Sequence, residues 1–319
     1  MPENLQNNLY LLGVIKMGVF DKLKKKNKEA GSASKQIREF DKIQFRKIVD
    51  EFKKETAIPS LKMMTIKDEK PSITSSKLGG NPYLPKGFEY PRNSDGELLR
   101  LLAQLNFSEL PKLENFPMEG ILQFYILDDD CYGVENFGNY SKQNNYRIVY
   151  HQEILPLDML QTDFSFLEQS SDEEDYFVLQ EEFKLTGELI NQHMVVGDYR
   201  FYRTFAEICQ KYGVSNYMDY NSDNFIENIY DDMYEELSLE QGTHLVNGYP
   251  AFAQVDPRED CASLEKFDTL LFQLDSEYNA ETENWDIIWG DAGVGNFFIN
   301  VEDLKNCNFD KVLYNYDCH

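Results

Sequence analysis

The sequence predicts a mainly β protein of the α+β class, with one compact body built from two related halves. Four blocks of residues occur twice in the same order, and several short runs alternate apolar with polar residues between Gly- and Pro-rich turns. Such alternation is typical of half-buried strands. Aromatic residues make up 14% and hydrophobic residues 42% of the 319 residues, which is enough to fill a large core.

The repeated blocks define the two halves. The second copy lies after the first by 168 residues at the glycines (80 and 248), 169 at the glutamines (104 and 273), 173 at the second glycines (120 and 293) and 164 at the tyrosines (150 and 314). Four blocks with a nearly constant offset predict an internal duplication. We place the halves at about 78–151 and 243–319, with an insert at about 152–242, inside a single body of residues 56–319.

The N-terminal region differs from this body. Residues 1–16 are unlike the rest of the chain in character, and Met17 is a plausible true start, so we expect 1–16 to be an extension from a misassigned start codon. Residues 17–55 form a basic arm with a lysine cluster at 22–28. Apolar residues at three- and four-residue steps between Ile37 and Phe52 predict a helix that ends before Pro59.

Charge is unevenly distributed. Residues 1–54 hold 13 Lys and Arg against 7 Asp and Glu, or +6, which leaves 18 (31 − 13) against 49 (56 − 7), or −31, for the rest. A body this acidic repels phosphate backbones, so nucleic acid is not an expected partner. The acidity serves either solubility or a surface complementary to a basic protein.

The elements of the body are predicted from local patterns. In the first half we expect strands over 101–107, 121–127 and 146–150, with a polar loop at 128–145. In the insert we expect an acidic surface segment over 152–190, centred on residues 172–175, and a strand-like stretch over 193–202. Helices are predicted over 204–212 and from Ser222 or Asp223 to Leu237. The second half begins at His244.

The chain shows no sign of export. Its longest early apolar run, residues 9–15, is too short to span a bilayer and lacks the flanks of a signal peptide. The five cysteines form no C-x-x-C pair, so reduced thiols in a cytoplasm are the simplest interpretation, with a Cys307–Cys318 disulfide as the alternative.

The repeated blocks together resemble the YwqG-like family of bacterial proteins. The resemblance rests on Leu78–Pro82, Ala103–Asn106, His244–Pro250 with Gln254, Trp289–Ile299 and Tyr314–Cys318. It covers about residues 55–319, although position 316 is Tyr where Trp is expected. The resemblance implies a β roll of two similar halves and implies no reaction, because the family has no established activity.

Two glutamines are the first candidates for a ligand site. Gln104 and Gln273 stand within predicted strands among apolar neighbours, and a buried amide without partners costs about 1–3 kcal/mol per unmet group. Either these amides tie each strand to the Gly-Pro segment of its own half, or they face a groove between the halves and bind a ligand. Gln254 and Trp289 complete the candidate ligand-binding set.

The best catalytic candidate is His244 with Asp291 or Asp317, because a histidine oriented by a carboxylate is a common acid–base pair. No G-x-S-x-G motif supplies a nucleophile, and His244 bonding to turn backbone is the alternative.

No metal ligands or cofactors are expected. No cysteine or histidine pair has zinc spacing. Asp219, Asn221 and Asp223 match the start of a calcium loop, but Asn224 and Tyr230 stand where Gly and Glu are required. Gly293 and Gly295 open a strand rather than a helix, so they mark a bulge or a close backbone approach instead of a dinucleotide fingerprint.

These observations favour a non-enzymatic cytoplasmic binding or interaction protein, with an inhibitor or immunity protein for a basic partner as one specific form. The alternative from another class is a small-molecule hydrolase that uses His244 with Asp291 or Asp317. A structural protein without a ligand would have no cleft between the halves.

Overall fold

A computed structural model describes residues 34–134, 140–167, 177–214, 234–259 and 261–319, with backbone alone for residues 34–42. The chain divides into two compact units, Met1–Asp50 and Glu51–His319. The proposed extension at 1–16, the lysine cluster at 22–28, the acidic centre at 172–175, the calcium-like loop and most of the helix predicted up to Leu237 lie outside the described residues.

The N-terminal helix is where the apolar spacing predicts it. Helix α2 spans Ser34–Thr56 and ends three residues before Pro59. Within the larger unit, the last turns of this helix carry Phe52, whose ring packs edge-on against Phe201 and Phe205 at centroid distances of 5.1 and 5.4 Å.

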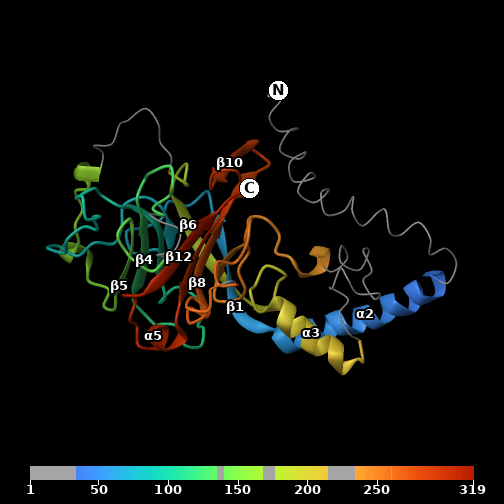
Figure 1. The fold of residues 1–319 in the computed structure, drawn as a ribbon. Helices are drawn as coiled ribbons and strands as arrows, with labels where there is room; N and C mark the ends of the chain where they lie inside the picture. The colour runs from blue at the N-terminus through green and yellow to red at the C-terminus, as the bar shows by residue number, and fades with distance from the viewer. Residues whose placement is uncertain (1–33, 135–139, 168–176, 215–233, 260) are drawn as a thin grey trace. The chain divides into compact units, whose positions relative to one another are not determined.

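The larger unit is dominated by one antiparallel sheet of ten strands (Figure 1). In spatial order the strands are β12-β11-β8-β7-β1-β6-β2-β3-β4-β5, and every pairing is antiparallel. The mainly β fold predicted from the sequence is therefore confirmed. Their bounds are β1 Ile58–Ile66, β2 Lys77–Leu78, β3 Arg100–Asn106, β4 Ile121–Ile126, β5 Tyr146–His151, β6 Phe183–Gln192, β7 His244–Val246, β8 Thr269–Asp275, β11 Val294–Ile299 and β12 Val312–Asp317.

The remaining described elements are short. A separate hairpin pairs β9 (Glu277–Asn279) with β10 (Asn284–Ile287). Helix α3 spans Phe201–Lys211 and ends before Gly213, as predicted, and helix α5 spans Val301–Lys305. Two single 3-10 turns, η1 and η2, cover Leu157–Met159 and Ser165–Leu167.

The order of the strands shows the duplication. The run β6-β2-β3-β4-β5 on one side matches β1-β7-β8-β11-β12 on the other, and β1 and β6 pair along nine residues where the two runs meet. Both β3 and β8 also carry one extra residue against their partner strand, Leu102 and Leu271. The offset of 164 between Tyr150 and Tyr314 is wrong, however. Tyr146 pairs with Ile126 of β4, and Val312 pairs with the equivalent Ile299 of β11. Tyr146 therefore corresponds to Val312, and Tyr150, four residues later, corresponds to Tyr316.

Two strands lie where the sequence predicted none. Strand β1 precedes the first predicted half, and β6 occupies the end of a segment assigned to the acidic surface, whereas residues 193–200 form no strand. The alternation of apolar and polar residues is irregular in both strands. Met64 of β1 is apolar but exposed, and Gly187 lies within the pattern of β6 without a side chain. Strong tertiary pairing decides their conformation where the local pattern is weak.

The two halves enclose one aromatic interior. Phe124 of the first half lies 5.0 Å from Phe272 and 4.9 Å from Phe297 of the second, measured between ring centroids. The outer strands of the sheet also approach each other, because the Tyr146 hydroxyl donates a hydrogen bond of 2.6 Å to the carbonyl of Val312. The sheet is therefore nearly closed, and its inner face is the main hydrophobic core.

Buried amides hold the outer face of each half. The Oε1 atom of Gln104 accepts a hydrogen bond from the Tyr83 backbone N–H at 2.8 Å, and its Nε2 donates to the carbonyl of Ser75 at 2.8 Å. Gln273 repeats this pattern with the N–H of Ala251 and the carbonyl of Thr243, at 2.7 Å each. Each amide ties its strand to the Gly-Pro segment of its own half.

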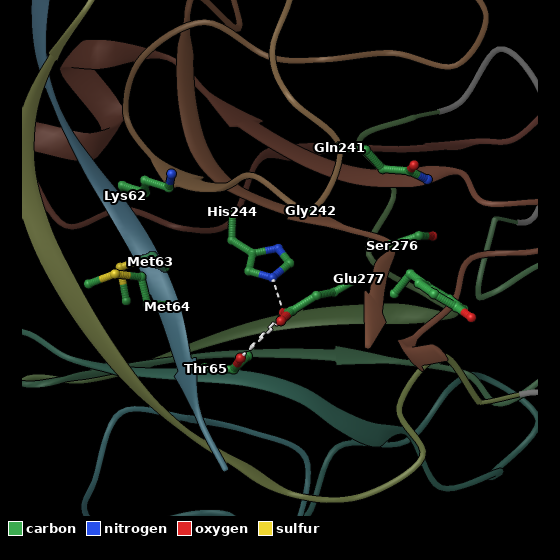
Figure 2. Close-up of a pocket in the computed structure, with 10 residues that line it drawn as sticks. Lys62, Met63, Met64, Thr65, Gln241, Gly242, His244, Ser276 and Glu277 are labelled. Carbon is green, nitrogen blue, oxygen red and sulfur yellow. Dashed lines mark hydrogen bonds and ion pairs between the residues drawn. The ribbon is translucent and has the colours of Figure 1, made fainter. Parts of the chain in front are cut away.

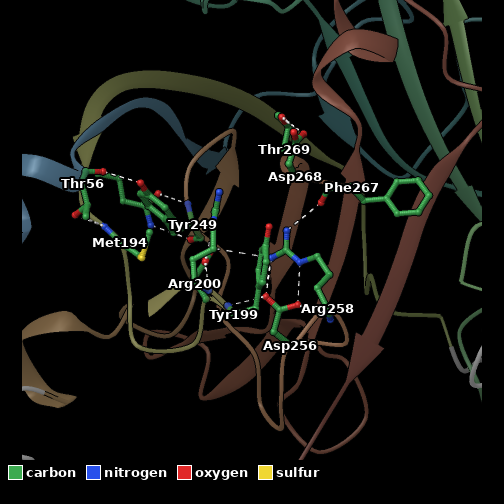
Figure 3. A network of polar contacts seen from close by, with 12 residues as sticks. Thr56, Met194, Tyr199, Arg200, Tyr249, Asp256, Arg258, Phe267, Asp268 and Thr269 are labelled. Carbon is green, nitrogen blue, oxygen red and sulfur yellow. Dashed lines mark hydrogen bonds and ion pairs between the residues drawn. The ribbon is translucent and has the colours of Figure 1, made fainter. Parts of the chain in front are cut away.

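A second anchor is a pair of Asp-x-Arg turns whose aspartates are both buried (Figure 3). Arg258 is 1% exposed, and its guanidinium donates two hydrogen bonds of 2.8 and 2.7 Å to the Asp256 carboxylate. The Arg200 guanidinium donates two hydrogen bonds of 2.7 Å to Asp198 in the same way. The Tyr199 backbone N–H donates to Asp256 at 3.2 Å, which joins the two turns. The start of α3 is thereby fixed to the segment that covers β8 and β11.

Replacing Gln104 by Leu is expected to lower the free energy of unfolding by at least about 2 kcal/mol, because two or more buried backbone groups lose partners at about 1–3 kcal/mol each. Urea denaturation would measure the change. Gln254→Leu is the matched control, since that side chain is exposed and makes a single bond to the carbonyl of Cys318. Equal effects of the two substitutions would contradict the bracing role.

Replacing Arg258 by Met is expected to cost about 3–5 kcal/mol, because it leaves the buried Asp256 carboxylate without its cation. Thermal and chemical unfolding would measure the loss. Arg203→Met makes the same chemical change at an exposed position on α3. A loss at Arg258 no larger than at Arg203 would show that the buried pair does not hold the fold.

Candidate functional site

The described part of the larger unit contains a polar pocket at one end of the sheet (Figure 2). It has a volume of about 370 Å³ and lies between the C-terminal part of β1, the segment before β7 and the start of β9. Pockets of a few hundred Å³ at the mouths of β-barrels are common ligand sites. Its lining residues are Lys62, Met63, Met64, Thr65, Gln241, Gly242, His244, Ser276, Glu277 and Tyr278.

His244 is buried at the centre of the site, and both of its ring nitrogens are occupied. Nδ1 accepts a hydrogen bond of 3.1 Å from the backbone N–H of Asp275, and Nε2 lies 3.0 Å from Oε2 of Glu277. Because Nδ1 is an acceptor, the hydrogen-bond network assigns the proton of the neutral ring to Nε2. His244 therefore donates to Glu277 and has no ring nitrogen left for a substrate.

Glu277 supplies the carboxylate of the pocket, and Lys62 is the basic residue among those that line it. It receives the His244 hydrogen bond and lies 3.3 Å from the Thr65 hydroxyl through each carboxylate oxygen, as Figure 2 shows. The hydrogen bond from His244 is the main reason that the pKa of Glu277 lies below its usual value, so the group is ionised at neutral pH. Its side chain is 25% exposed. The carboxylate can therefore accept further hydrogen bonds from a ligand.

Asp275 positions three residues of the pocket. Its carboxylate accepts hydrogen bonds of 2.8 Å from the backbone N–H groups of Gly242 and Ser276, while its own N–H donates to His244. Burial raises the pKa of Asp275 to about 6, and the two N–H donors oppose this rise. The two neighbouring carboxyls, Asp275 and Glu277, thus shift in opposite directions because one is desolvated and the other is hydrogen-bonded by a histidine.

The first half provides an internal comparison. There Ser76 stands in place of His244, and its hydroxyl accepts a 2.9 Å hydrogen bond from the N–H of Asn106, the counterpart of Asp275. Lys184 of β6 pairs with Lys77 of β2, and Lys62 of β1 pairs in the same way with Leu245 of β7. Lys184 is therefore the counterpart of Lys62. Three residues further along each strand, Gly187 is the counterpart of Thr65.

The equivalent space in the first half is filled. A Cβ atom on Gly187 would lie 3.2 Å from the Leu110 side chain and 3.6 Å from that of Pro111. The pocket therefore arises from substitutions in one half of a common frame rather than from the frame itself.

The predicted catalytic partners of His244 do not contact it. The structure pairs His244 with Glu277 instead of Asp291 or Asp317. Two strands, β8 and β11, separate His244 on β7 from Asp317 on β12. Asp317 accepts a 2.7 Å hydrogen bond from the N–H of Gln254, and Asp291 is exposed. Sequence distance and residue type alone could not show which carboxylate would reach the ring.

The candidate ligand-binding residues do not form a common groove. Gln104 and Gln273 are fully buried, and both polar atoms of each amide have protein partners. Gln254 is exposed and bonds to Cys318. Trp289 is fully buried and stacks on Tyr316 at 5.5 Å. The aromatic interior occupies the space between the halves.

The close backbone approach predicted at the strand opening is confirmed at Gly293, where a Cβ atom would lie 2.0 Å from the carbonyl oxygen of Asp317. At Gly295 the close neighbour is a side chain, because a Cβ atom there would lie 2.4 Å from the ring of Trp289. Glycine at position 295 of β11 therefore leaves room for the indole of Trp289 against the backbone.

The sequence did not predict the residues that form the hydrogen-bond network around His244, namely Thr65, Asp275 and Glu277. Glu277 and Asp275 come after the second glutamine by four and two residues (277 − 273 and 275 − 273). A comparison of the two repeats could have found them, because Ser108 and Asn106 stand at the equivalent positions of the first half. Thr65 carries no such signal, since β1 itself was not recognised as a strand.

The arrangement offers a carboxylate that can hold a cation, and the serine beside it is fully hydrogen-bonded. Ser276 is fully buried, donates from its hydroxyl to the carbonyl of Gly293 at 2.7 Å and accepts from the N–H of Trp289 at 3.0 Å. It is therefore not a free nucleophile. Within the described ranges, no group of three or more His, Cys, Asp or Glu side chains could hold a metal ion.

The fold and the pocket together define a class of protein: a duplicated, nearly closed antiparallel sheet with a polar pocket beside β1, β7 and β9. Residues 76–318 match the family model described as a domain of unknown function, DUF1963, and the chain belongs to this family. A search of curated proteins finds no match. Strand β1, which supplies one wall of the pocket, lies before the matched region.

The raised pKa of Asp275 predicts a specific pH dependence of stability. A carboxyl with a folded pKa of about 6 and an unfolded value near 3.9 binds its proton more tightly in the folded state. Its stabilising contribution is therefore complete below the unfolded pKa and is lost as the pH rises through about 6. Between pH 7.5 and pH 5, the wild type should gain about 1 kcal/mol relative to Asp275→Asn.

Urea denaturation of both proteins across this range would measure the difference. The wild-type curve alone does not isolate Asp275, because burial lowers the pKa of His151 to about 4 and gives that residue the opposite sign in the same window. Parallel curves for the two proteins would contradict the assignment.

Proposed function

We propose that the protein is a non-enzymatic binding module that holds a cationic group of a basic partner on Glu277. The observation that carries this proposal is the ionised, 25% exposed carboxylate of Glu277 in a pocket whose histidine has both ring nitrogens engaged. An ammonium or guanidinium group is the natural complement of a carboxylate that still has free acceptor sites.

The charge of the chain supports a basic partner. Residues 55–319 carry a net charge of −31 from 18 basic and 49 acidic residues, which would attract a basic protein over a long range and speed association. An inhibitor or immunity protein that masks a basic surface is one specific form of this function. The hydrolase alternative has less support, because the pair of His244 with Asp291 or Asp317 is not assembled and Ser276 is fully bonded.

We also propose that the protein is a YwqG-like member of its family that works in the cytoplasm. The five cysteines are all free, as expected of thiols in a reducing compartment. In the part of the chain that the structure describes, none of the helices has the length and apolar character needed to cross a bilayer.

The proposal is tested by replacing Glu277 with Gln, which keeps the size of the side chain and removes its charge. Binding of N-acetyl-arginine amide, measured by calorimetry or by NMR shifts at His244 and Gly242, is expected to weaken about tenfold or more. Glu283→Gln is the matched control, because it removes one exposed carboxylate of the neighbouring hairpin. Binding that is insensitive to the Glu277 change, or stronger for an anionic probe, would rule the proposal out.

A further inference from the structure

We infer that the open edge of β1 beside the pocket accepts an extended segment of a protein partner, which places a lysine or arginine side chain on Glu277. This inference rests on the proposed function and adds the form in which the cation is presented.

One edge of β1 is only partly paired. All nine residues of this strand pair with β6 on one side, but only Leu61, Lys62 and Met63 pair with β7 on the other. Among the described strands, none pairs with residues 64–66 on that side. Alternate residues of a strand direct their N–H and C=O groups to opposite edges. The Pro59 carbonyl accepts a hydrogen bond from Asn247 beside β7, so Thr65, six residues further along, directs its backbone groups to the same edge, where no described strand pairs with them.

The pocket runs along that edge. Four consecutive residues of β1, Lys62–Thr65, line the cavity. Successive side chains of a strand point to opposite faces of the sheet, so a cavity over one face would be lined by every second residue. A cavity lined by consecutive residues therefore extends along the edge of the strand.

The β9 side of the cavity carries the acidic group, whereas Lys62 lines it from β1. Glu277 and Tyr278 of β9 line it there, and β9 pairs with β10 along its other edge. Thr65 of β1 already contacts the Glu277 carboxylate across the gap, which places the charge at the level of the unpaired part of β1. An added strand could thus bond through its main chain and present one side chain to Glu277.

A polypeptide fits this site better than a small cation does. Addition of an extended peptide to a sheet edge takes its affinity from main-chain hydrogen bonds and its specificity from side-chain pockets. The ionised Glu277 and the acidic body select a basic side chain. A free amine would use the carboxylate and leave the strand edge unpaired, so the structure favours an extended basic segment.

The test uses capped seven-residue peptides of alternating Thr and Val with a central Arg, because these residue types favour extended structure. The comparison peptides carry a central Gln, or N-methyl groups on alternate residues in two complementary patterns. N-acetyl-arginine amide is the probe for the cation alone. Affinities are measured by calorimetry with the full chain, and backbone amide shifts of residues 64–66 are followed by NMR.

The Arg peptide is expected to bind at least tenfold more tightly than the Gln peptide and than N-acetyl-arginine amide. One N-methylation pattern should weaken binding at least tenfold, and the Arg peptide alone should shift the amides of residues 64–66. Glu277→Gln should remove the preference for Arg over Gln, whereas Glu283→Gln should leave it unchanged.

The two proposals fail in different ways. Arg peptides that bind equally with both N-methylation patterns, or that bind no better than N-acetyl-arginine amide, would overturn strand addition and leave the cation site intact. A preference for Arg that persists in Glu277→Gln would overturn the cation site itself. Absence of any peptide binding at millimolar concentration would also overturn the strand-addition inference.

Discussion

The constraint on which the rest of this structure depends is the burial of side-chain amides within the apolar sheet. Gln104 and Gln273 have no contact with water, so every polar atom of each amide must find a protein partner or cost free energy. They find them in the backbone of the segments that cross the outer face of their own half. These segments also carry the turns that begin each half. The same amide therefore fixes the position of the crossing segment relative to the strand beneath it.

The two halves keep this frame and differ in what they build on it. In the first half the backbone N–H of Asn106 donates to the Ser76 hydroxyl. In the second half the equivalent N–H, that of Asp275, donates to His244. In the first half, Leu110 closes over Gly187 and the space is filled. In the second, Thr65 and Glu277 leave it open and polar. The scaffold is thus maintained by shared hydrogen bonds, and the pocket is a local departure from them.

The electrostatics of the pocket result from unequal solvation of two neighbouring carboxyls. Asp275 is enclosed, so its charge is disfavoured and its pKa raised even though two backbone N–H groups point at it. Glu277 reaches the cavity, where the His244 donor favours its ionised form and lowers its pKa. Asp275 therefore serves to position the backbone, whereas Glu277 supplies the charge that a ligand would meet. The proposed binding role thus falls to a partly exposed acid, and the structural role to a buried one.

The amino-acid sequence by itself determined the class of the fold, the duplication and most strands of the two halves. Those features depend on local patterns: alternating apolar residues, glycines at turns and blocks that recur at a nearly constant spacing. The N-terminal helix up to Thr56 and the helix before Gly213 were predictable for the same reason. The buried glutamines were also recognisable, because an amide among apolar strand residues requires partners wherever it lies.

Only the tertiary structure decided the positions of β1 and β6 and the partner of His244. Strand β1 lies before the first half along the chain but joins the second, and β6 does the reverse, so neither pairing has a local signature. Glu277 reaches His244 because β7 and β8 pair side by side and the chain then turns into a hairpin. Distances between side chains on different strands depend on register and on strand order. A single sequence does not contain that information in any short segment, and for this reason the pocket could be found only once the sheet was assembled.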